Sequence, residues 1–301
     1  TDGCHLYSRH TTPSNSCLGE ALAAMEGTET ANVSASGMGA ITPVLLQLCG
    51  AGDHIVSSRT IYGGTYAFLK NFTPRLAIQT SFVDITNLEI VEAAITENTK
   101  VLYCESVSNP LLEVANIKGL AALAKKYSLT LVVDNTFSPL SISPIQLGAD
   151  VVVHSLTKFI NGSSDAVGGV VCGSQEFIDQ LRSVIDGACM LLGSTMDSLR
   201  ASSILKNLRT LHIRMKQHSY NASYLANKFE ADGIKTVYPG LESHPSHPLF
   251  TSMMNIEYGY GGMLTIDAGS LEKANALMEA MQQNNVGYLA VSLGFYKTLF
   301  S

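Results

Sequence analysis

The sequence predicts an α/β protein built on a mostly parallel β-sheet that is flanked by helices. From about residue 53, short runs of β-branched residues alternate with segments whose apolar residues follow helical spacing, as in successive βαβ units. Two of these runs, residues 131–133 and 151–153, consist only of Leu and Val. Strands of that composition are buried on both faces, which is typical of a parallel sheet.

Five strands are expected in the first part of the chain, with helices between some of them. The expected strands are residues 54–57, 101–105, 129–134, 151–155 and 169–172. The spacing from Thr86 to Glu89 is that of a capping box, which opens a helix. The apolar positions of this helix are Leu88, Val91 and Ile95, and those of the next crossover helix are Ile117, Leu120, Ala124 and Tyr127.

A smaller α+β domain is expected after residue 212. A long helical stretch covers residues 197–231, and a connection rich in Gly, His and Pro follows it. Beyond this connection we expect a strand at residues 262–267 and then a helix capped by Ser270. This helix bears Leu271, Ala274, Leu277, Met278 and Met281, and its methionines are expected to fill a core.

Composition and charge exclude several classes of protein. A length of 301 residues corresponds to about two domains, and 46% hydrophobic against 15% charged residues excludes a disordered chain. The formal net charge is −6 without any cluster of Lys and Arg, so neither nucleic acid nor an anionic membrane is expected as a partner. Polar residues interrupt the longest uncharged run, residues 30–52, which therefore fails as a membrane span.

The six cysteines are scattered without a C-x-x-C pair, which disfavours a disulfide framework or a zinc site. Cys49 and Cys172 lie in apolar runs, where a free cysteine behaves as a small buried residue in a reducing compartment. The spacing of His244 and His247 could ligate a metal, but the neighbouring prolines favour a rigid loop. The sequence opens at Thr1 without a signal-like segment. We expect a cytoplasmic protein with no metal site.

Polar residues follow three of the expected strands. Asp134 ends one strand, Asn109 follows another, and Ser155, Thr157 and Lys158 follow a third. In open α/β sheets the ligand binds beyond the carboxyl ends of the strands. A carboxylate, hydroxyl groups and an amine at this edge suit a phosphate-bearing aromatic cofactor that the amine holds covalently.

The segment from Ser36 to Gly39 precedes a helix that is expected to begin at about Ile41. Glycine at the start of a helix lets a phosphate approach the free backbone N–H groups. The same segment nearly imitates a dinucleotide fingerprint, but the third glycine is absent and no acid ends the strand near residue 57. A nicotinamide dehydrogenase is therefore disfavoured.

Residues 151–169, VVVHSLTKFINGSSDAVGG, resemble the lysine segment of the Cys/Met-metabolism enzymes that use pyridoxal 5′-phosphate (PLP). Supporting blocks are residues 7–9, 36–38, 61–66, 108–110, 133–136, 238–241, 243–245 and 291–294. Residues 69–74, 81–85, 101–111 and 258–262 are most similar to those of plant-type methionine γ-lyases. The resemblance implies a fold-type I PLP-dependent transferase, with the fold of aspartate aminotransferase.

The resemblance also implies a role for each candidate residue. Lys158 would hold the cofactor covalently and move protons, and Asp134 would keep the pyridine nitrogen protonated. Tyr62 would stack on the ring and donate a proton to the γ leaving group. The other implied contacts are the Gly37 and Met38 amides and the Ser155 and Thr157 hydroxyls on the phosphate, Tyr7 and Arg9 on the phosphate from a neighbouring subunit, and Asn109 and Ser292 on the substrate carboxylate.

By the same resemblance, the protein would be a homotetramer, a dimer of dimers in which subunits share active sites. Its parts would be an N-terminal arm at residues 1–12, a cofactor domain at 13–212 and a C-terminal domain at 213–301. The arm and the C-terminal domain are shorter than in the family, whose Arg for the substrate carboxylate falls beyond Ser301. Gly64 stands where many bacterial methionine γ-lyases carry Cys.

The implied reaction is γ-elimination of a sulfur amino acid, with L-methionine giving methanethiol, 2-oxobutanoate and ammonia. A cystathionine γ-lyase or γ-synthase, or an O-acetylhomoserine sulfhydrylase, would use the same Lys158, Asp134 and Tyr62. A non-catalytic relative that keeps the fold as a binding subunit would be expected to lose Lys158 or Asp134, and neither is lost.

Overall fold

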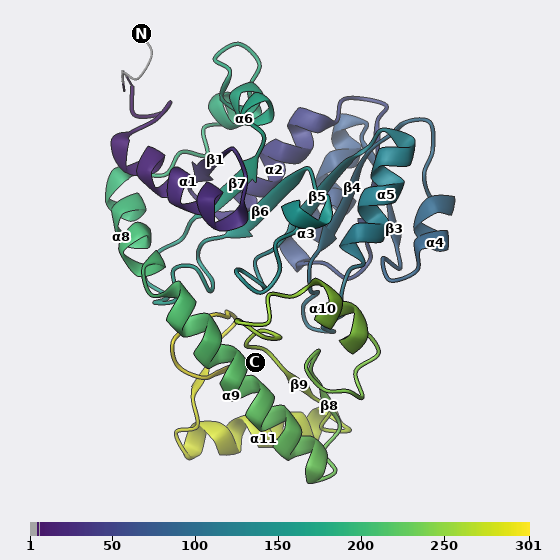
Figure 1. Cartoon of the computed structure of the whole chain (residues 1–301), viewed down its shortest axis with the longest axis vertical. Helices are drawn as coiled ribbons and strands as arrows, with labels where there is room; N and C mark the ends of the chain where they lie inside the picture. Colours follow the sequence, from purple (N-terminus) through teal and green to yellow (C-terminus); the bar gives the residue numbers. More distant parts are fainter. Residues whose placement is uncertain (1–4, 6) are drawn as a thin grey trace.

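The computed structural model describes residue 5 and residues 7–301. Within these residues, a seven-stranded sheet forms the upper half of the molecule in Figure 1. Its strands, in spatial order, are β1 (Thr30–Ser34), β7 (Gly169–Gly173), β6 (Val151–Ser155), β5 (Thr130–Asp134), β4 (Thr99–Glu105), β2 (His54–Ser58) and β3 (Gln79–Val83). From β6 to β3 neighbouring strands are parallel, whereas β7 runs antiparallel to both β6 and β1. The predicted mostly parallel sheet is confirmed.

All five expected strands occur as β2, β4, β5, β6 and β7, with ends displaced by at most two residues. The sequence missed β1 and β3, which form the two edges of the sheet. An edge strand has one paired neighbour and buries less side-chain surface, and β3 contains no fully buried residue. The apolar pattern of β3 in the sequence is correspondingly weak.

Both faces of the sheet are buried under helices. Alternate residues of β5 point to opposite faces, so that Leu131 and Val133 join one core cluster and Val132 joins the other. The first cluster includes residues of α1 (Pro13–Glu26) and α5 (Ile117–Tyr127), and the second includes residues of α2 (Gly37–Leu48) and α6 (Gln175–Arg182). In Figure 1, α1 and α5 lie in front of the sheet and α2 lies behind it.

The capping-box prediction at Thr86 was wrong. Helix α4 (Leu88–Ala93) begins one residue later than this box requires, with Asn87 as its N-cap. The Asn87 side chain accepts hydrogen bonds from the backbone N–H groups of Glu89 and Ile90. Thr86 instead turns toward Asp84, to whose carboxylate both its N–H and its hydroxyl donate.

Helix α5 confirms the predicted crossover helix but not all of its buried face. Ile117, Leu120 and Ala124 are buried as expected. Tyr127 is exposed, and its hydroxyl donates to the carboxylate of Glu92 on α4. A tyrosine at the end of a helix can place its ring beside the core while its hydroxyl reaches a surface partner.

The second half of the chain contains longer helices and small two-stranded pairs (Figure 1). The predicted helical stretch forms two helices, α8 (Ser198–Leu208) and α9 (Leu211–Ala231), which are separated by Arg209 and Thr210. The remaining elements are β8 (Thr236–Val237), α10 (His247–Met253), β9 (Thr265–Ile266), α11 (Leu271–Gln283), β10 (Tyr288–Leu289) and β11 (Leu299–Phe300). The predicted strand at residues 262–267 is thus reduced to β9, which pairs with β8.

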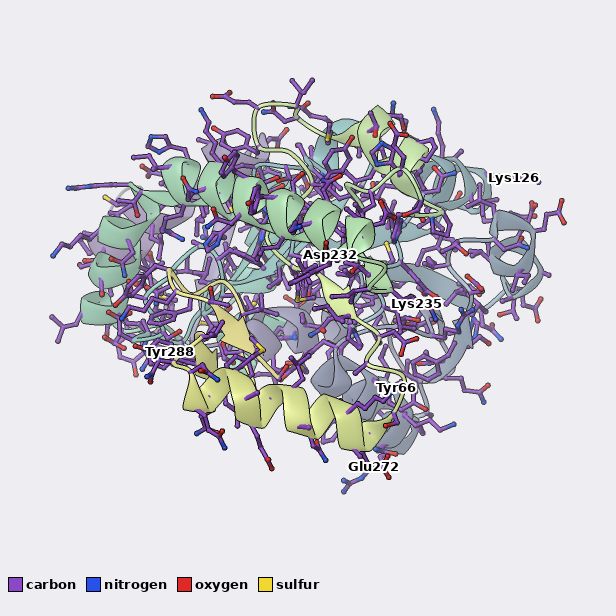
Figure 2. All side chains as sticks on the ribbon, turned by 90° about the horizontal axis from the view of Figure 1, so that it is seen from below. Tyr66, Lys126, Asp232, Lys235, Glu272 and Tyr288 are labelled. Atoms are coloured by element: carbon purple, nitrogen blue, oxygen red, sulfur yellow. The ribbon has the colours of Figure 1, made fainter. Side chains whose placement is uncertain are left out.

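Ser270 caps α11 as predicted, because its hydroxyl accepts the N–H of Lys273. The prediction that the methionines of this helix fill a core was wrong, since α11 has no buried residue within the described chain. Figure 2 shows α11 along one side of the lower face, with Glu272 near one end and Tyr288 near the other. Its apolar residues Leu271 and Leu277 are exposed.

Among the described residues, no helix combines the length and the apolar composition needed to cross a membrane. The five described cysteines are free, and four of them are buried, Cys49 and Cys172 included. The sixth, Cys4, lies outside the described residues.

Candidate active site

The candidate site lies at the carboxyl ends of β4, β5 and β6, next to the N-terminus of α2. Asp134 ends β5, and its register partner is Glu105 at the end of β4. Ser155 ends β6, and the turn after it carries Lys158. The Thr136 hydroxyl links two of these ends, because it donates to Asp134 and accepts the backbone N–H of Ser155 at 2.8 Å.

Asp134 is a buried carboxyl group with three hydroxyl or amide donors. Its Oδ1 accepts the N–H and the hydroxyl of Thr136 at 3.0 and 2.5 Å, and its Oδ2 lies 3.5 Å from the Tyr103 hydroxyl. Burial raises the pKa of Asp134, and the donors and the nearby His154 oppose this shift. Among the described residues, no Lys, Arg or His forms an ion pair with it. The group is therefore suited to meet a cationic ring nitrogen from a ligand.

Glu105 is a site residue that the sequence analysis missed. Its Oε1 accepts the backbone N–H of Tyr62 at 2.6 Å, and the nearby backbone N–H of Asn109 also favours the ionised form of this carboxyl group. Its Oε2 has no partner among the described residues. Burial, and then the charge of Asp134, raise the pKa of Glu105 to about 8. The available signal was an acid that ends an apolar strand next to the strand of Asp134.

The N-terminus of α2 forms a cradle against β6 and β7. The helix begins at Gly37 rather than at Ile41, because the Ser36 hydroxyl caps it by accepting the N–H of Gly39 at 2.9 Å. A Cβ at position 37 would lie 2.9 Å from Cβ of Ser155, and one at position 169 would lie 2.1 Å from the carbonyl oxygen of Ser36. Glycine at both positions therefore lets the start of α2 lie this close to β6 and β7.

This earlier start places Gly37 and Met38 in the first turn of α2, where backbone N–H groups have no partner within the helix. Together with the adjacent Ser155, they present the donors that a phosphate requires. Thr157 is engaged elsewhere, because its hydroxyl accepts the N–H of Gly168 at 3.1 Å and lies 3.4 Å from the Gly168 carbonyl oxygen.

Lys158 contacts Ser292 across 134 residues of sequence. Its Nζ donates to the Ser292 hydroxyl at 3.1 Å, and burial lowers the pKa of the amine. The segment after Ser292 rests directly on the lysine turn, because a Cβ at position 294 would lie 2.3 Å from the backbone nitrogen of Phe159. Gly294 also has a φ of +78°, a conformation that favours glycine.

Tyr62 lies at the start of α3 (Gly63–Ala67), and half of the residue is exposed. Glu105 holds its backbone, and its ring lies against Gly64, where a Cβ would be 2.6 Å from Cε1 of the ring. The glycine at position 64 thus allows this ring position. The backbone N–H of Asn109 lies near the carboxyl group of Glu105, whose pKa it lowers.

Tyr7 and Arg9 lie beside α7 (Ala188–Leu192). Nη1 of Arg9 donates to the carbonyl oxygen of Met190 at 2.9 Å, and the guanidinium group lies 5.3 Å from the centre of the Tyr7 ring. Within the described residues, no hydrogen bond or ion pair joins them to Lys158, Asp134 or Tyr62. Within the described part of one chain, Tyr7 and Arg9 thus make no polar contact with these three residues.

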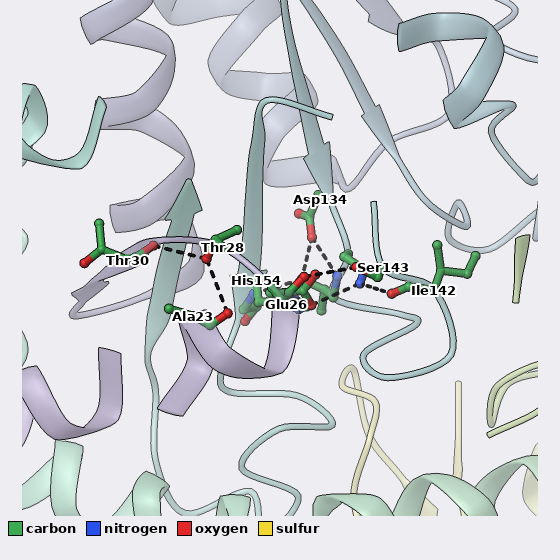
Figure 3. A network of polar contacts seen from close by, with 11 residues as sticks. Ala23, Glu26, Thr28, Thr30, Asp134, Ile142, Ser143 and His154 are labelled. Carbon is green, nitrogen blue, oxygen red and sulfur yellow. Dashed lines mark hydrogen bonds and ion pairs between the residues drawn. The ribbon is translucent and has the colours of Figure 1, made fainter. Parts of the chain in front are cut away.

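A buried polar network supports the end of β5 from below (Figure 3). His154 Nε2 lies 2.7 Å from Oε1 of Glu26 on α1, and Nδ2 of Asn135 donates to Oε1 of Glu26 and to the carbonyl oxygen of Ile142. Asn135 directly follows Asp134, so this network holds the turn on which Asp134 depends.

His244 and His247 contact their own loop. The backbone N–H of Ser246 donates to Nδ1 of His244, and Nδ1 of His247 lies 2.8 Å from the carbonyl oxygen of Pro239. The described part of the chain contains no group of three or more His, Cys, Asp or Glu side chains arranged to hold a metal ion.

These features fit a PLP-type cofactor. Lys158 offers an amine with a lowered pKa, and Asp134 is a buried carboxyl group without an ion-pair partner among the described residues. Oε2 of Glu105 is a buried polar atom that likewise lacks a partner there. The glycine-lined start of α2 offers free N–H groups for a phosphate.

Comparison with known proteins points the same way. The sequence model of the family described as "Cys/Met metabolism PLP-dependent enzyme" matches residues 1–301. Methionine gamma-lyase of Arabidopsis thaliana is 48% identical over 300 residues, which cover 99% of this chain and 68% of the relative. Cystathionine gamma-lyase of Bacillus subtilis is 37% identical over 299 residues, which cover 98% of this chain and 76% of the relative.

A solved structure shows the same fold. It is a Campylobacter jejuni protein described as an O-acetylhomoserine (thiol)-lyase, with a pyridoxyl-lysine monophosphate group. It matches with a TM-score of 0.89 and 31% sequence identity, covering 97% of this chain and 80% of that chain.

Proposed function

Because the chain belongs to the family of Cys/Met metabolism PLP-dependent enzymes, we propose that it is a carbon–sulfur lyase that acts on L-methionine. The reaction consumes methionine and water and yields methanethiol, 2-oxobutanoate and ammonia. One observation carries the proposal. The amine of Lys158 and the carboxyl group of Asp134 lie at the carboxyl ends of the neighbouring strands β6 and β5, in a chain that is 48% identical to a methionine gamma-lyase.

PLP, when bound, supplies an aldehyde that reacts with amines and a ring that accepts the electron pair released at the substrate Cα. Burial lowers the pKa of Lys158, which increases the fraction of neutral amine able to act as nucleophile and base. Ser292 orients this amine by accepting a hydrogen bond from Nζ. Asp134, as an anion, would keep the ring nitrogen of the bound cofactor protonated.

Breaking the Cγ–S bond requires a proton for the departing sulfur. We assign this proton to the Tyr62 hydroxyl, since the residue is partly exposed at the site while Glu105 and Gly64 define its position. The Gly37 and Met38 amides and the Ser155 and Thr157 hydroxyls would hold the phosphate, with Asn109 and Ser292 at the substrate carboxylate. Thr157 would have to exchange its bond with Gly168 for one with the phosphate.

A product assay tests the proposed reaction. The purified protein with PLP would be given methionine, cystathionine, homocysteine, or O-acetylhomoserine with sulfide, and 2-oxobutanoate, thiols and homocysteine would be measured. We expect methanethiol and 2-oxobutanoate from methionine in equal amounts. Preferred turnover of cystathionine would instead indicate a cystathionine gamma-lyase, the activity named for the Bacillus subtilis relative. Homocysteine formation from O-acetylhomoserine would indicate an O-acetylhomoserine (thiol)-lyase, the activity named for the Campylobacter jejuni protein.

Tyr62→Phe is expected to slow γ-elimination of methionine by about 10²-fold, because it removes the proton donor for the sulfur. Exchange of the substrate Cα proton should change much less, since Lys158 moves that proton. Methanethiol release and deuterium incorporation, measured by NMR, separate the two steps. Tyr66→Phe on α3 is the matched control, and equal losses in both steps of Tyr62→Phe would contradict the assigned role.

We further propose a homodimer with shared active sites, paired into a tetramer. Arg9 contacts Met190 in a segment, residues 184–199, that exposes several large apolar side chains. These are Val184, Ile185, Leu191, Leu192 and Leu199. A cluster of this kind beside a guanidinium group suits contact with a second copy. The partner's copies of Tyr7 and Arg9 would then reach the phosphate.

Complementation tests the shared site. Arg9→Ala and Lys158→Ala proteins are each expected to be nearly inactive, whereas their mixed dimer has one site with both Lys158 and Arg9 intact. Purified mixed dimers, isolated through two different tags, should therefore regain about half of the wild-type activity per dimer. No recovery in verified mixed dimers would mean that Arg9 serves its own chain.

Two further assignments belong to the proposal. We place the boundary between the cofactor domain and the C-terminal domain at residue 212, at the start of α9, because the large sheet precedes it and the two-stranded pairs follow it.

We also propose a cytoplasmic location, which the free thiols of the five described cysteines support.

A further inference from the structure

Glu105 connects three residues of the candidate site. Its Oε1 accepts the backbone N–H of Tyr62 at 2.6 Å, and the nearby backbone N–H of Asn109 also favours its ionised form. In the sheet it lies directly opposite Asp134. One side chain thus anchors the start of α3 and lies near the loop after β4, while it neighbours the carboxyl group of Asp134.

The surroundings of this side chain are buried and lack a compensating cation. Glu105 is 6% exposed, as is Asp134. The titratable groups near it are Asp134 from β5 and Tyr103 on the same face of its own strand, with the Tyr62 loop on the remaining side, whereas the adjacent Cys104 points to the opposite face. No Lys, Arg or His of the described residues forms an ion pair with it. Two buried carboxylates side by side cannot both ionise without a large cost.

The donors decide which of the two groups keeps the negative charge. Asp134 accepts the N–H and hydroxyl of Thr136 and lies within reach of the Tyr103 hydroxyl, and the nearby His154 further favours its anion. Among the described residues, Glu105 accepts a hydrogen bond only from the backbone N–H of Tyr62. Oε1 takes the N–H of Tyr62, which leaves Oε2, the oxygen with no partner among the described residues, to carry a proton.

We propose that Glu105 is a positioning residue that holds the proton of the Glu105–Asp134 pair, so that Asp134 alone is the anion offered to the cofactor ring nitrogen and Tyr62 stays anchored beside it. This inference rests on the proposed function for the identity of the cofactor. The raised pKa of Glu105, about 8, agrees with a neutral acid at pH 7. Above that pH, Glu105 ionises and places a second negative charge beside Asp134.

Infrared spectroscopy of the holoenzyme tests the protonation directly. At pH 7 we expect the C=O stretch of a protonated carboxylic acid, which should disappear as the pH is raised through about 8. Glu105→Gln should remove this band. Glu92→Gln, which changes an exposed carboxylate on α4, is the matched control and should retain it. A holoenzyme without the band, or a band that persists in Glu105→Gln, would overturn the proposal.

The affinity for PLP supplies a second readout. Between pH 7 and 9 the wild-type Kd should rise by about tenfold, as titration of one group near pH 8 requires if only its neutral form supports binding. Glu105→Gln, which mimics the neutral acid, should bind PLP as tightly as the wild type at pH 7 and show a smaller rise. A tenfold weaker affinity of this variant at pH 7 would mean that the anion of Glu105 is required.

A third variant keeps the test decisive if Glu105→Gln does not fold. Asp134→Asn removes the neighbouring charge that raises the pKa of Glu105, so the infrared band of the acid should titrate at a lower pH than in the wild type. An unchanged midpoint would contradict the proposal that the charge of Asp134 keeps Glu105 protonated. None of these measurements depends on which sulfur amino acid is cleaved, so a failed product assay with methionine leaves the result on Glu105 standing.

Discussion

Lys158→Ala protein is expected to lose covalently bound PLP and to lose lyase activity by about 10⁴-fold or more, because one side chain supplies both the covalent attachment and the base for the substrate Cα proton. Its Nζ is partly buried, has a lowered pKa and donates to Ser292. These features distinguish it from the exposed lysines of the chain, such as Lys126, which forms an ion pair with Glu92.

Borohydride reduction and peptide mapping measure the attachment. In the wild type, the reduced cofactor should be found on the peptide that contains Lys158. Lys126→Ala is the control and should retain both the label and the activity, since its side chain lies on the surface between α5 and α4. A cofactor label on another lysine of the wild type would refute the assignment of Lys158.

Asp134→Asn is expected to retain PLP but to lose about 10³-fold in kcat, since an amide does not keep the ring nitrogen protonated and so weakens the ring as an electron acceptor. The fold should survive the change, because the amide oxygen can still accept both bonds from Thr136. The PLP absorbance measures cofactor content, and methanethiol release measures kcat.

Asp150→Asn is the matched control for this prediction. Asp150 is an exposed carboxylate just before β6, at the opposite end of β5 and β6 from Asp134, where it accepts the backbone N–H of Leu131 at 2.7 Å. The variant should keep near-normal kcat, because the amide oxygen can accept the same bond. Full activity of Asp134→Asn would show that Asp134 only orders its loop.

The central strands and the lysine turn could be predicted from sequence because their signals are local. Strand β6 is buried on both faces, so its run of valines has a single interpretation, and its predicted ends are those observed. The segment of residues 151–169 carries the family resemblance within one stretch of chain. Edge strand β3 exposes most of its side chains in part, and its sequence is therefore ambiguous.

Local competition explains the errors at helix ends. The caps of α4 and α2 depend on which side chain captures a given N–H group, and this depends on neighbours such as Asp84 and on the approach of β7 to Gly37. The apolar face of α11 follows helical spacing, yet no described part of the chain buries it. Periodicity predicts that a helix forms and which face is apolar, but not what covers that face.

By itself, the sequence determined the α/β class, the order of the central strands along the chain and the residues at their carboxyl ends, because burial and backbone preference act over a few neighbouring residues. Only the tertiary structure decided which of these residues meet. The register of β4 against β5 places Glu105 beside Asp134, and packing of the C-terminal part brings Ser292 to Lys158. Such contacts join positions far apart in the chain, and their charges and pKa values follow from the shared burial that no single segment encodes.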